Sequence, residues 1–292
     1  MHTKGKKLVF NKYPGLRIGF TTQNFRLAVP VNATSLSEII AYASAEGYHF
    51  IEIRDDNASL TTDECKLLAD LARKLEIEVI YEIHKNPLDP AFGEVLDRGL
   101  NNAVLFPDPG VLRVLLSLSE FNAYPDKQGW TKDELERVIQ ITETSASAAK
   151  SKNVRLIVEN VNEPFFGDGS VYYGLAEFFE NTTLTGLQFD ISNPFTVTAR
   201  MRTEPEHVAG FLSQLGKRWV TTHLKTITGI GGKATPALAD NPLPVSRVIE
   251  LMGLQDIRYA ALELSPVAEW QDCCLNHEKS IQFLRETGII EK

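Results

Sequence analysis

The chain alternates between short apolar runs rich in β-branched residues and longer segments whose apolar positions recur every three or four residues. The first pattern is typical of buried strands, and the second is typical of amphipathic helices. Residues 103–106 form one more apolar run, which competes with 111–116 for the fourth strand. The eight runs predicted as strands are 16–21, 49–54, 77–83, 111–116, 154–160, 185–190, 219–224 and 258–264.

Helices are predicted between these strands, and three of them begin with a capping-box signature, in which a hydroxyl residue and a glutamate three positions later satisfy each other's backbone donors. The pairs are Ser35 with Glu38, Thr61 with Glu64, and Thr131 with Glu134. Further helices are predicted over 90–102, 171–180, 205–215, 244–253 and 269–286.

The alternation predicts an α/β protein built from right-handed βαβ units around a parallel sheet. Eight such units favour a closed (β/α)8 TIM barrel over an open doubly wound sheet. No glycine-rich fingerprint for a dinucleotide follows the first strand, and no P-loop occurs. Because no Ser/Gly/Pro-rich linker divides the chain, we expect residues 1–292 to form a single domain.

The net charge, the number of cysteines and the length of the apolar runs limit the kinds of molecule that this protein is expected to bind. The 292 residues include 30 Lys and Arg against 38 Asp and Glu, a net charge of −8, so no basic field is present to hold nucleic acid. Three cysteines cannot build a disulfide framework. No apolar stretch approaches the ~20 residues that span a bilayer, and no signal-peptide core follows the N-terminus. We therefore expect a cytoplasmic protein with neither nucleic acid nor membrane as a partner.

Candidate functional residues occur at the ends of four consecutive predicted strands. Each of these apolar runs ends in a polar residue, and the four are Glu159, Asp190, His223 and Glu263. In a TIM barrel the carboxyl ends of the strands meet at one rim, so these four side chains are expected to converge. Taken singly, each acid is more often a helix cap or an ion-pair partner than a ligand. The same placement four times in succession favours a shared site.

This set of side chains predicts a single divalent metal ion. Two Glu, one Asp and one His are hard oxygen ligands with a single imidazole, which suits Mn²⁺, Mg²⁺, Co²⁺ or Zn²⁺. Without a cation, three carboxylates in a poorly solvated barrel mouth would repel one another. A divalent ion removes that penalty.

The same segments resemble the xylose isomerase-like TIM-barrel family, which contains sugar phosphate isomerases and epimerases. The likeness spans nearly the whole chain, and the segments that carry it are 47–53, 158–160, 189–193, 223–225 and 262–263. The resemblance implies that Glu159, Asp190, His223 and Glu263 bind one divalent metal ion. It also implies that Glu159 and Glu263 are the catalytic acid/base pair.

A sugar isomerase or epimerase is therefore the expected activity, with a small-molecule sugar or sugar derivative as substrate. Proton transfer through a metal-bound enediolate gives epimerisation when the proton returns to the opposite face, and isomerisation when it returns to the adjacent carbon. The substrate's identity, its phosphorylation and the assembly of the chain as a monomer or homo-oligomer stay open.

The candidate substrate-binding residues are Asn193, Lys225, Glu52 and His84. Ketose 3-epimerases carry a histidine where this chain has Asn193, and an arginine shortly after the strand-seven histidine, where this chain continues from Lys225 without one. A specific ketose 3-epimerase is therefore not expected. For Glu52 the family pattern also indicates a hydrogen bond behind the metal ligands.

Three other functions use a related barrel. Endonuclease IV-type cleavage needs a histidine-rich, multi-metal site and an electropositive face, and this acidic chain has only six histidines. A keto-inositol dehydratase-type lyase uses the same ligands, and the sequence does not exclude it. A non-catalytic carbohydrate- or metabolite-binding barrel also stays open, although two glutamates across the substrate favour an enzyme.

Overall fold

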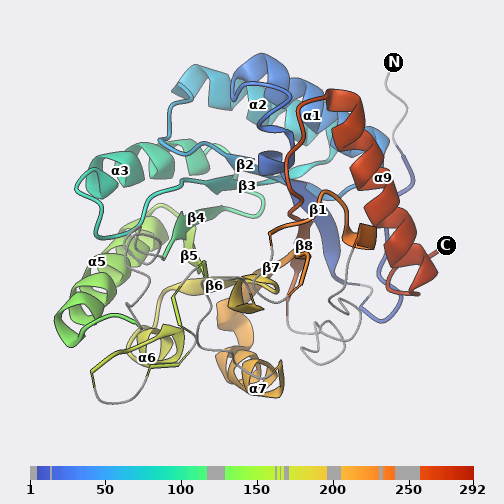
Figure 1. Cartoon of the computed structure of the whole chain (residues 1–292). Coiled ribbons are helices and arrows are strands. Elements are labelled where there is room, and N and C mark those ends of the chain that lie inside the picture. The colour runs from blue at the N-terminus through green and yellow to red at the C-terminus, as the bar shows by residue number, and fades with distance from the viewer. Residues whose placement is uncertain are drawn as a thin grey trace.

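Eight parallel strands pair in sequence order, and the last pairs with the first, so the sheet closes into a barrel (Figure 1). The computed structural model describes residues 5–13, 15–116, 129–161, 163–164, 166–167, 171–195, 205–229, 233–240 and 257–292. The predicted (β/α)8 barrel is confirmed, and every predicted strand is present with ends shifted by at most two residues. The strands are β1 Arg17–Thr21, β2 Phe50–Arg54, β3 Glu78–Glu82, β4 Val111–Leu115, β5 Arg155–Glu159, β6 Gly186–Asp190, β7 Trp219–Leu224 and β8 Tyr259–Leu262.

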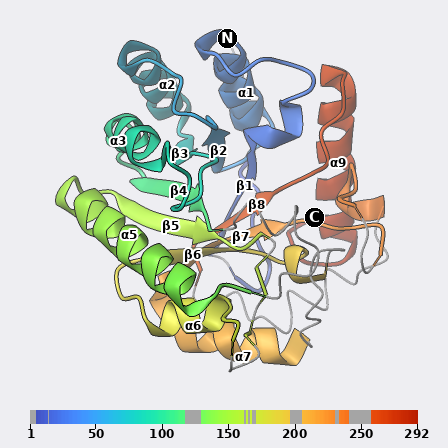
Figure 2. The same ribbon diagram turned by 60° about the vertical axis from the view of Figure 1, so that its left-hand side comes forward.

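The helices form a ring outside the barrel (Figures 1 and 2). They are α1 Ala33–Ala45, α2 Thr62–Leu75, α3 Phe92–Ala103, α5 Lys132–Ser151, α6 Leu175–Glu180, α7 Pro205–Leu215 and α9 Trp270–Glu286. The predicted helix over 244–253 lies outside the described residues. Residues 103–106 end α3 and turn toward β4, so the competing assignment of the fourth strand is wrong. None of the helices in the described part of the chain is long and apolar enough to cross a bilayer.

Two of the three predicted capping boxes are present. The Thr61 hydroxyl accepts from Glu64 N at 3.3 Å, and Thr61 N donates to the Glu64 carboxylate at 2.9 Å; Thr131 and Glu134 repeat the arrangement. The box at Ser35 is wrong, because α1 begins two residues before Ser35. Asn32 caps the helix instead, with its side-chain oxygen accepting from Ser35 N at 2.9 Å. Asparagine is as good a cap as serine, and it comes first along the chain.

The barrel interior is layered. At the N-terminal ends of the strands an apolar layer closes the barrel; its members are Phe50, Ile80, Val111, Ile157, Val220, Tyr259 and Ala261. Side chains two positions further along a strand point to the same side. Glu52, Glu82, Arg113 and Glu159 therefore lie above this layer, toward the C-terminal mouth. A separate and larger apolar core lies between the strands and the helices.

Candidate active site

The four predicted ligand residues converge at the C-terminal end of the barrel. Glu159 ends β5, Asp190 ends β6 opposite His223 of β7, and Glu263 follows β8. One ligand atom from each lies within 4.8 Å of the others. His223 Nδ1 is 2.8 Å from Glu263 Oε2, 3.1 Å from Glu159 Oε1 and 3.8 Å from Asp190 Oδ2. Four side chains from a stretch whose ends, Glu159 and Glu263, are 104 positions apart thus face one point.

Asp190 is fixed by the backbone that follows it. Its Oδ1 accepts hydrogen bonds from Ser192 N and Asn193 N, both at 2.8 Å. Its own backbone N donates to Asn160 Oδ1 at 2.7 Å. The second oxygen, Oδ2, is fully buried and makes no hydrogen bond. The short turn after β6 therefore aims one carboxylate oxygen at the convergence point.

His223 is oriented from behind by Glu52. The imidazole Nε2 lies 2.7 Å from Glu52 Oε2, and Gln188 Nε2 donates to Glu52 Oε1 at 2.6 Å. A carboxylate at Nε2 keeps the proton on that nitrogen and turns Nδ1 toward the other acids. Burial opposes the charged imidazolium, but the carboxylates of Glu52, Glu263 and Glu159 raise the pKa of His223 well above its ordinary value. The surrounding carboxylates therefore favour the positively charged form of the His223 imidazole.

Glu159 is held by a buried arginine from β4. Arg113 Nη1 lies 3.0 Å from Glu159 Oε2, and Arg113 Nη2 donates to Glu82 Oε2 at 2.6 Å. Burial alone would raise the pKa of Glu159, but Arg113 and His223 lower it to about 2. For Glu82 burial dominates and raises the pKa to about 8 despite Arg113. Glu159 is thus an ionised carboxylate with one oxygen anchored and the other facing His223.

Lys225 joins Glu263 to Asp190. Its Nζ lies 3.1 Å from Asp190 Oδ2 and 3.3 Å from Glu263 Oε2, and it donates to Asn193 Oδ1 at 3.2 Å. Burial disfavours the ionised form of Glu263, but Lys225 and His223 lower its pKa well below the ordinary value. Both members of the predicted acid/base pair are therefore ionised.

The donor set fits a divalent cation. Among the described residues the site holds five carboxylates, from Glu52, Glu82, Glu159, Asp190 and Glu263, against the permanent cations Arg113 and Lys225. Asp190 Oδ2 and His223 Nδ1 are buried and make no hydrogen bond, and their near neighbours are charged groups, Lys225 Nζ at 3.1 Å and Glu263 Oε2 at 2.8 Å. Atoms placed in this way are available as ligands for a metal ion. Three carboxylate oxygens and one imidazole nitrogen suit Mg²⁺, Mn²⁺, Co²⁺ or Zn²⁺.

The four candidate substrate-binding residues lie at three different positions relative to the cluster. Asn193 and Lys225 lie at the cluster. Glu52 is fully buried beneath His223, with its Oε2 2.7 Å from the imidazole Nε2. His84 lies on the rim, with Nδ1 3.8 Å from Asp56 Oδ1. Burial and the neighbouring arginines, first Arg54, lower the pKa of His84 to about 4, so it is neutral.

Two residues of the site were not identified from the sequence, Arg113 and Gln188. Both lie inside apolar strand runs, and Gln188 lies two positions before Asp190. A charged or amide side chain within a run that packs on both faces is itself a signal, because only a polar barrel interior accommodates it. The period of two along β6 would also have placed Gln188 on the same side as Asp190.

Asn24, in the 3-10 turn Thr22–Phe25 after β1, brackets Glu263. Its Nδ2 donates to Leu262 O at 3.1 Å, and its Oδ1 accepts from Leu264 N at 2.9 Å. The same amide nitrogen lies 3.0 Å from Nε2 of His277 on α9. The backbone on both sides of Glu263 is therefore held by one buried side chain.

Comparison with known proteins shows this fold in solved structures, although no sequence match is found. Neither a protein-family model nor a curated protein sequence matches the chain. Solved structures do match. D-allulose 3-epimerase from Methylomonas sp., in complex with D-allulose, has a TM-score of 0.67 at 14% identity, over 96% of this chain and 99% of the other.

Two further structures agree. A sugar phosphate isomerase/epimerase from Parabacteroides distasonis has a TM-score of 0.65 at 14% identity, over 98% of both chains. A xylose isomerase-like TIM barrel protein from Mycobacterium smegmatis, in complex with magnesium, has a TM-score of 0.60 at 13% identity, over 93% of this chain and 97% of the other. The fold that the sequence resemblance predicted is thereby confirmed.

Proposed function

We propose that this protein is a divalent-metal-dependent sugar isomerase or epimerase. One observation carries the proposal: two ionised glutamates, Glu159 from β5 and Glu263 after β8, face His223 Nδ1 at 3.1 and 2.8 Å. A site that only holds a metal does not need acids on both flanks, whereas a proton transfer between two faces of a substrate does. The structural neighbours named as epimerases support the same reading.

Glu159, Asp190, His223 and Glu263 would hold the metal ion. When bound, a divalent ion supplies Lewis acidity that makes the C–H beside a ketose carbonyl more acidic and stabilises the negative charge that develops on oxygen. His223 must release the proton on Nδ1 for this, while Glu52 retains the one on Nε2. The residues then act as positioned acids and bases.

Glu159 acts as the base that removes the substrate proton. The low pKa of its carboxylate is set by Arg113, which holds Oε2 and leaves Oε1 toward the site. On the other flank the proton would come from the Lys225 ammonium, 3.3 Å from Glu263 Oε2, and pass through the Glu263 carboxylate to the substrate; Lys225 would then regain a proton from solvent, and Glu159 would release the one it took up. Delivery to the same carbon inverts it, and delivery to the adjacent carbon exchanges ketose for aldose.

Asn193 does not take the place of the histidine that ketose 3-epimerases carry at this position. Its Nδ2 donates to Asn160 O at 2.7 Å, and its Oδ1 accepts from Lys225. These bonds tie the turn after β6 to β5 and to Lys225. We therefore assign Lys225, with its side chain 14% exposed, as the polar contact for a substrate oxygen.

The test is exchange of substrate C–H protons with D₂O, followed by NMR on a panel of ketoses and keto-inositols with Mn²⁺, Mg²⁺ or Co²⁺. The proposal expects metal-dependent exchange into at least one ketose, with loss of at least 100-fold in Glu159→Gln. The matched control is Glu136→Gln, a largely exposed acid on α5.

Two other results of this experiment would indicate a different function for the site. Binding of a sugar without exchange, under every metal, would make the barrel a binding protein. Loss of water from a keto-inositol, seen as a new unsaturated ketone, would make it a lyase that uses the same base. Each result contradicts the proposal in a different way.

A further inference from the structure

A second cavity lies at the opposite end of the barrel from the candidate active site. It measures about 260 Å³ and is lined by Arg155, Lys217 and Arg258 over the apolar side chains of Val111, Val220 and Tyr259. Arg155 begins β5, Lys217 lies in the 3-10 turn Gly216–Arg218 before β7, and Arg258 immediately precedes β8. The N-terminal ends of three strands thus bring three cations to one hollow.

Among the described residues that line this cavity, none is an aspartate or a glutamate. The Arg155 guanidinium donates to the backbone oxygen of Lys217 at 2.6 Å, which satisfies one of its five N–H groups and none of its charge. Arg258 lies over the Tyr259 ring at 5.4 Å, and its nearest acid is Glu78, at 3.7 Å from Nη2. Burial lowers the pKa of Arg155, so this cation is partly desolvated, and it forms no ion pair with a described acid.

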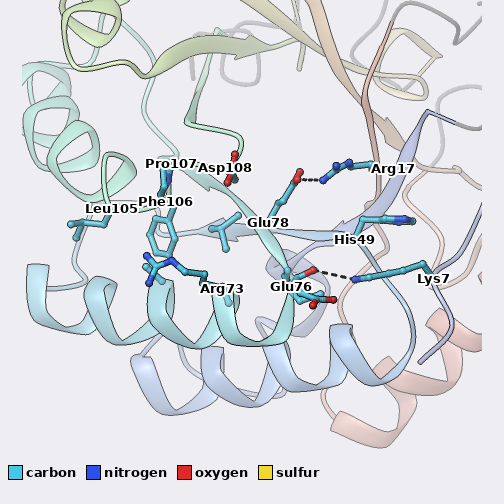
Figure 3. A pocket seen from close by; sticks show the side chains of 14 residues that line it. Lys7, Arg17, His49, Arg73, Glu76, Glu78, Leu105, Phe106, Pro107 and Asp108 are labelled. Atoms are coloured by element: carbon cyan, nitrogen blue, oxygen red, sulfur yellow. Dashed lines mark hydrogen bonds and ion pairs between the residues drawn. The ribbon is translucent and has the colours of Figure 1, made fainter. Parts of the chain in front are cut away.

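The adjoining hollow at the same end is different. It measures about 370 Å³, and its arginine, Arg17, forms an ion pair with Glu78 (Figure 3). Lys7 donates to the backbone oxygen of Glu76 at 3.2 Å, and Asp108 lies on the far wall. Arg17 in that hollow is paired with an acid, and Arg258 of the smaller cavity reaches the same Glu78 at 3.7 Å; Arg155 and Lys217 form no ion pair with an acid in the described part of the chain.

The cavity is separate from the metal-ligand cluster. The apolar layer that contains Phe50, Ile80 and Ile157 lies between them, together with the buried Glu52, Glu82 and Arg113 above it. A molecule in the cavity would contact the bottom of this layer, through Val111 and Tyr259, and none of the four ligand residues.

We propose that this cavity binds the dianion of a phosphate group. Two guanidinium forks and one ammonium match phosphate oxygens by charge-assisted hydrogen bonds. The volume is below the roughly 300–1,000 Å³ of pockets that hold drug-sized molecules. The ligand is therefore orthophosphate or the phosphate end of a small metabolite, and a nucleotide is too large.

The experiment is calorimetric titration with orthophosphate and, separately, with glycerol 3-phosphate, at an ionic strength fixed with NaCl. The proposal expects saturable binding at millimolar concentration or below, weakened at least tenfold in Lys217→Ala/Arg258→Ala. Removing the Lys217 side chain leaves the backbone oxygen that Arg155 contacts, and circular dichroism checks the fold. The control is Lys66→Ala/Arg73→Ala, two exposed cations on α2 that pair within their own helix.

Several results would overturn the proposal: no saturable heat with either ligand, equal binding in both double variants, or an effect that NaCl alone reproduces. Loss of binding in Lys225→Ala would also overturn it, because that result would place the phosphate at the active site. Tighter binding of glycerol 3-phosphate than of orthophosphate would identify a phosphorylated metabolite as the source, and the reverse would identify free phosphate.

Discussion

His223 Nε2 lies 2.7 Å from Glu52 Oε2, a contact that joins β7 to β2 across the barrel. Glu52 is fully buried and receives a second hydrogen bond from Gln188, so it cannot turn away. This contact determines which nitrogen of the imidazole faces Glu159, Asp190 and Glu263. The orientation of this candidate metal ligand is therefore set by a residue outside the cluster of Glu159, Asp190, His223 and Glu263.

Replacing Glu52 by glutamine should weaken metal binding. The neutral amide no longer polarises the imidazole, and its NH₂ group competes for the position of the Nε2 proton. We expect a loss of about 10- to 100-fold in Mn²⁺ affinity, measured by isothermal titration calorimetry. Glu136→Gln on α5 is the control, and an unchanged affinity in Glu52→Gln would contradict the assigned role.

Replacing Arg113 by methionine should destabilise the fold. Glu159 and Glu82 would lose the cation 3.0 and 2.6 Å away, and a buried charge without its partner costs about 3–5 kcal/mol. Urea unfolding measures the change in free energy. Adding Glu159→Gln to Arg113→Met should recover part of the loss, since the buried carboxylate that lost its cation is then a neutral amide; a further loss in the double variant would refute the explanation.

Asn24→Ala should lower activity more than its effect on stability suggests. The variant leaves Leu262 O and Leu264 N without their shared partner, so the segment that carries Glu263 loses its position. We expect a stability loss of about 1–3 kcal/mol together with a fall in kcat. The matched control is Asn102→Ala, a buried asparagine that binds Leu60 O and Tyr81 Oη far from the site. Equal kcat in the two variants would show that Asn24 is merely structural.

His277 should make the protein less stable in acid. Burial lowers its pKa from 6.5 to about 3 in the folded state, so the unfolded chain binds the extra proton between these values. Stability is therefore lost as the pH falls below 6.5. Between pH 7.5 and 4.5 this group contributes about 2–3 kcal/mol of that loss.

The measurement is urea unfolding across this pH range for the wild type and for His277→Gln, whose amide cannot titrate. Tyr48 Oη and Asn24 Nδ2, 3.1 and 3.0 Å from the ring nitrogens, are neutral and remain in both proteins. Other histidines contribute equally to both curves, so their difference isolates His277. Parallel curves for the two proteins would contradict the prediction.

The strands and the four ligand candidates were predictable because both follow from local patterns. A buried parallel strand is an apolar run, and a functional residue at its carboxyl end interrupts that run at a fixed place, as Asp190 and Glu263 do. Residues that are one βα unit apart in the sequence lie on neighbouring strands of the barrel, so their side chains are close in space. Nothing beyond chain order was needed to expect that these side chains meet.

The hydrogen bonds that orient the candidate ligands from behind could not be predicted from local patterns. Gln188 and Glu52 are 136 positions apart, and His223 and Glu52 are 171 apart. Such pairs depend on the stagger of the barrel, which places inward side chains of different strands at one height. The missed cap at Asn32 has a local cause, since two adequate caps lay three residues apart and the first one nucleated α1.

The apolar floor that contains Phe50, Ile80 and Ile157 lies beneath the candidate active site. Under the proposed function, the proton that Glu159 takes up would therefore leave toward the C-terminal mouth, and the proton returned on the other flank would enter from the same side, where Lys225 is 14% exposed. Product formed in D₂O should thus carry solvent deuterium, delivered from above a base that water does not cross.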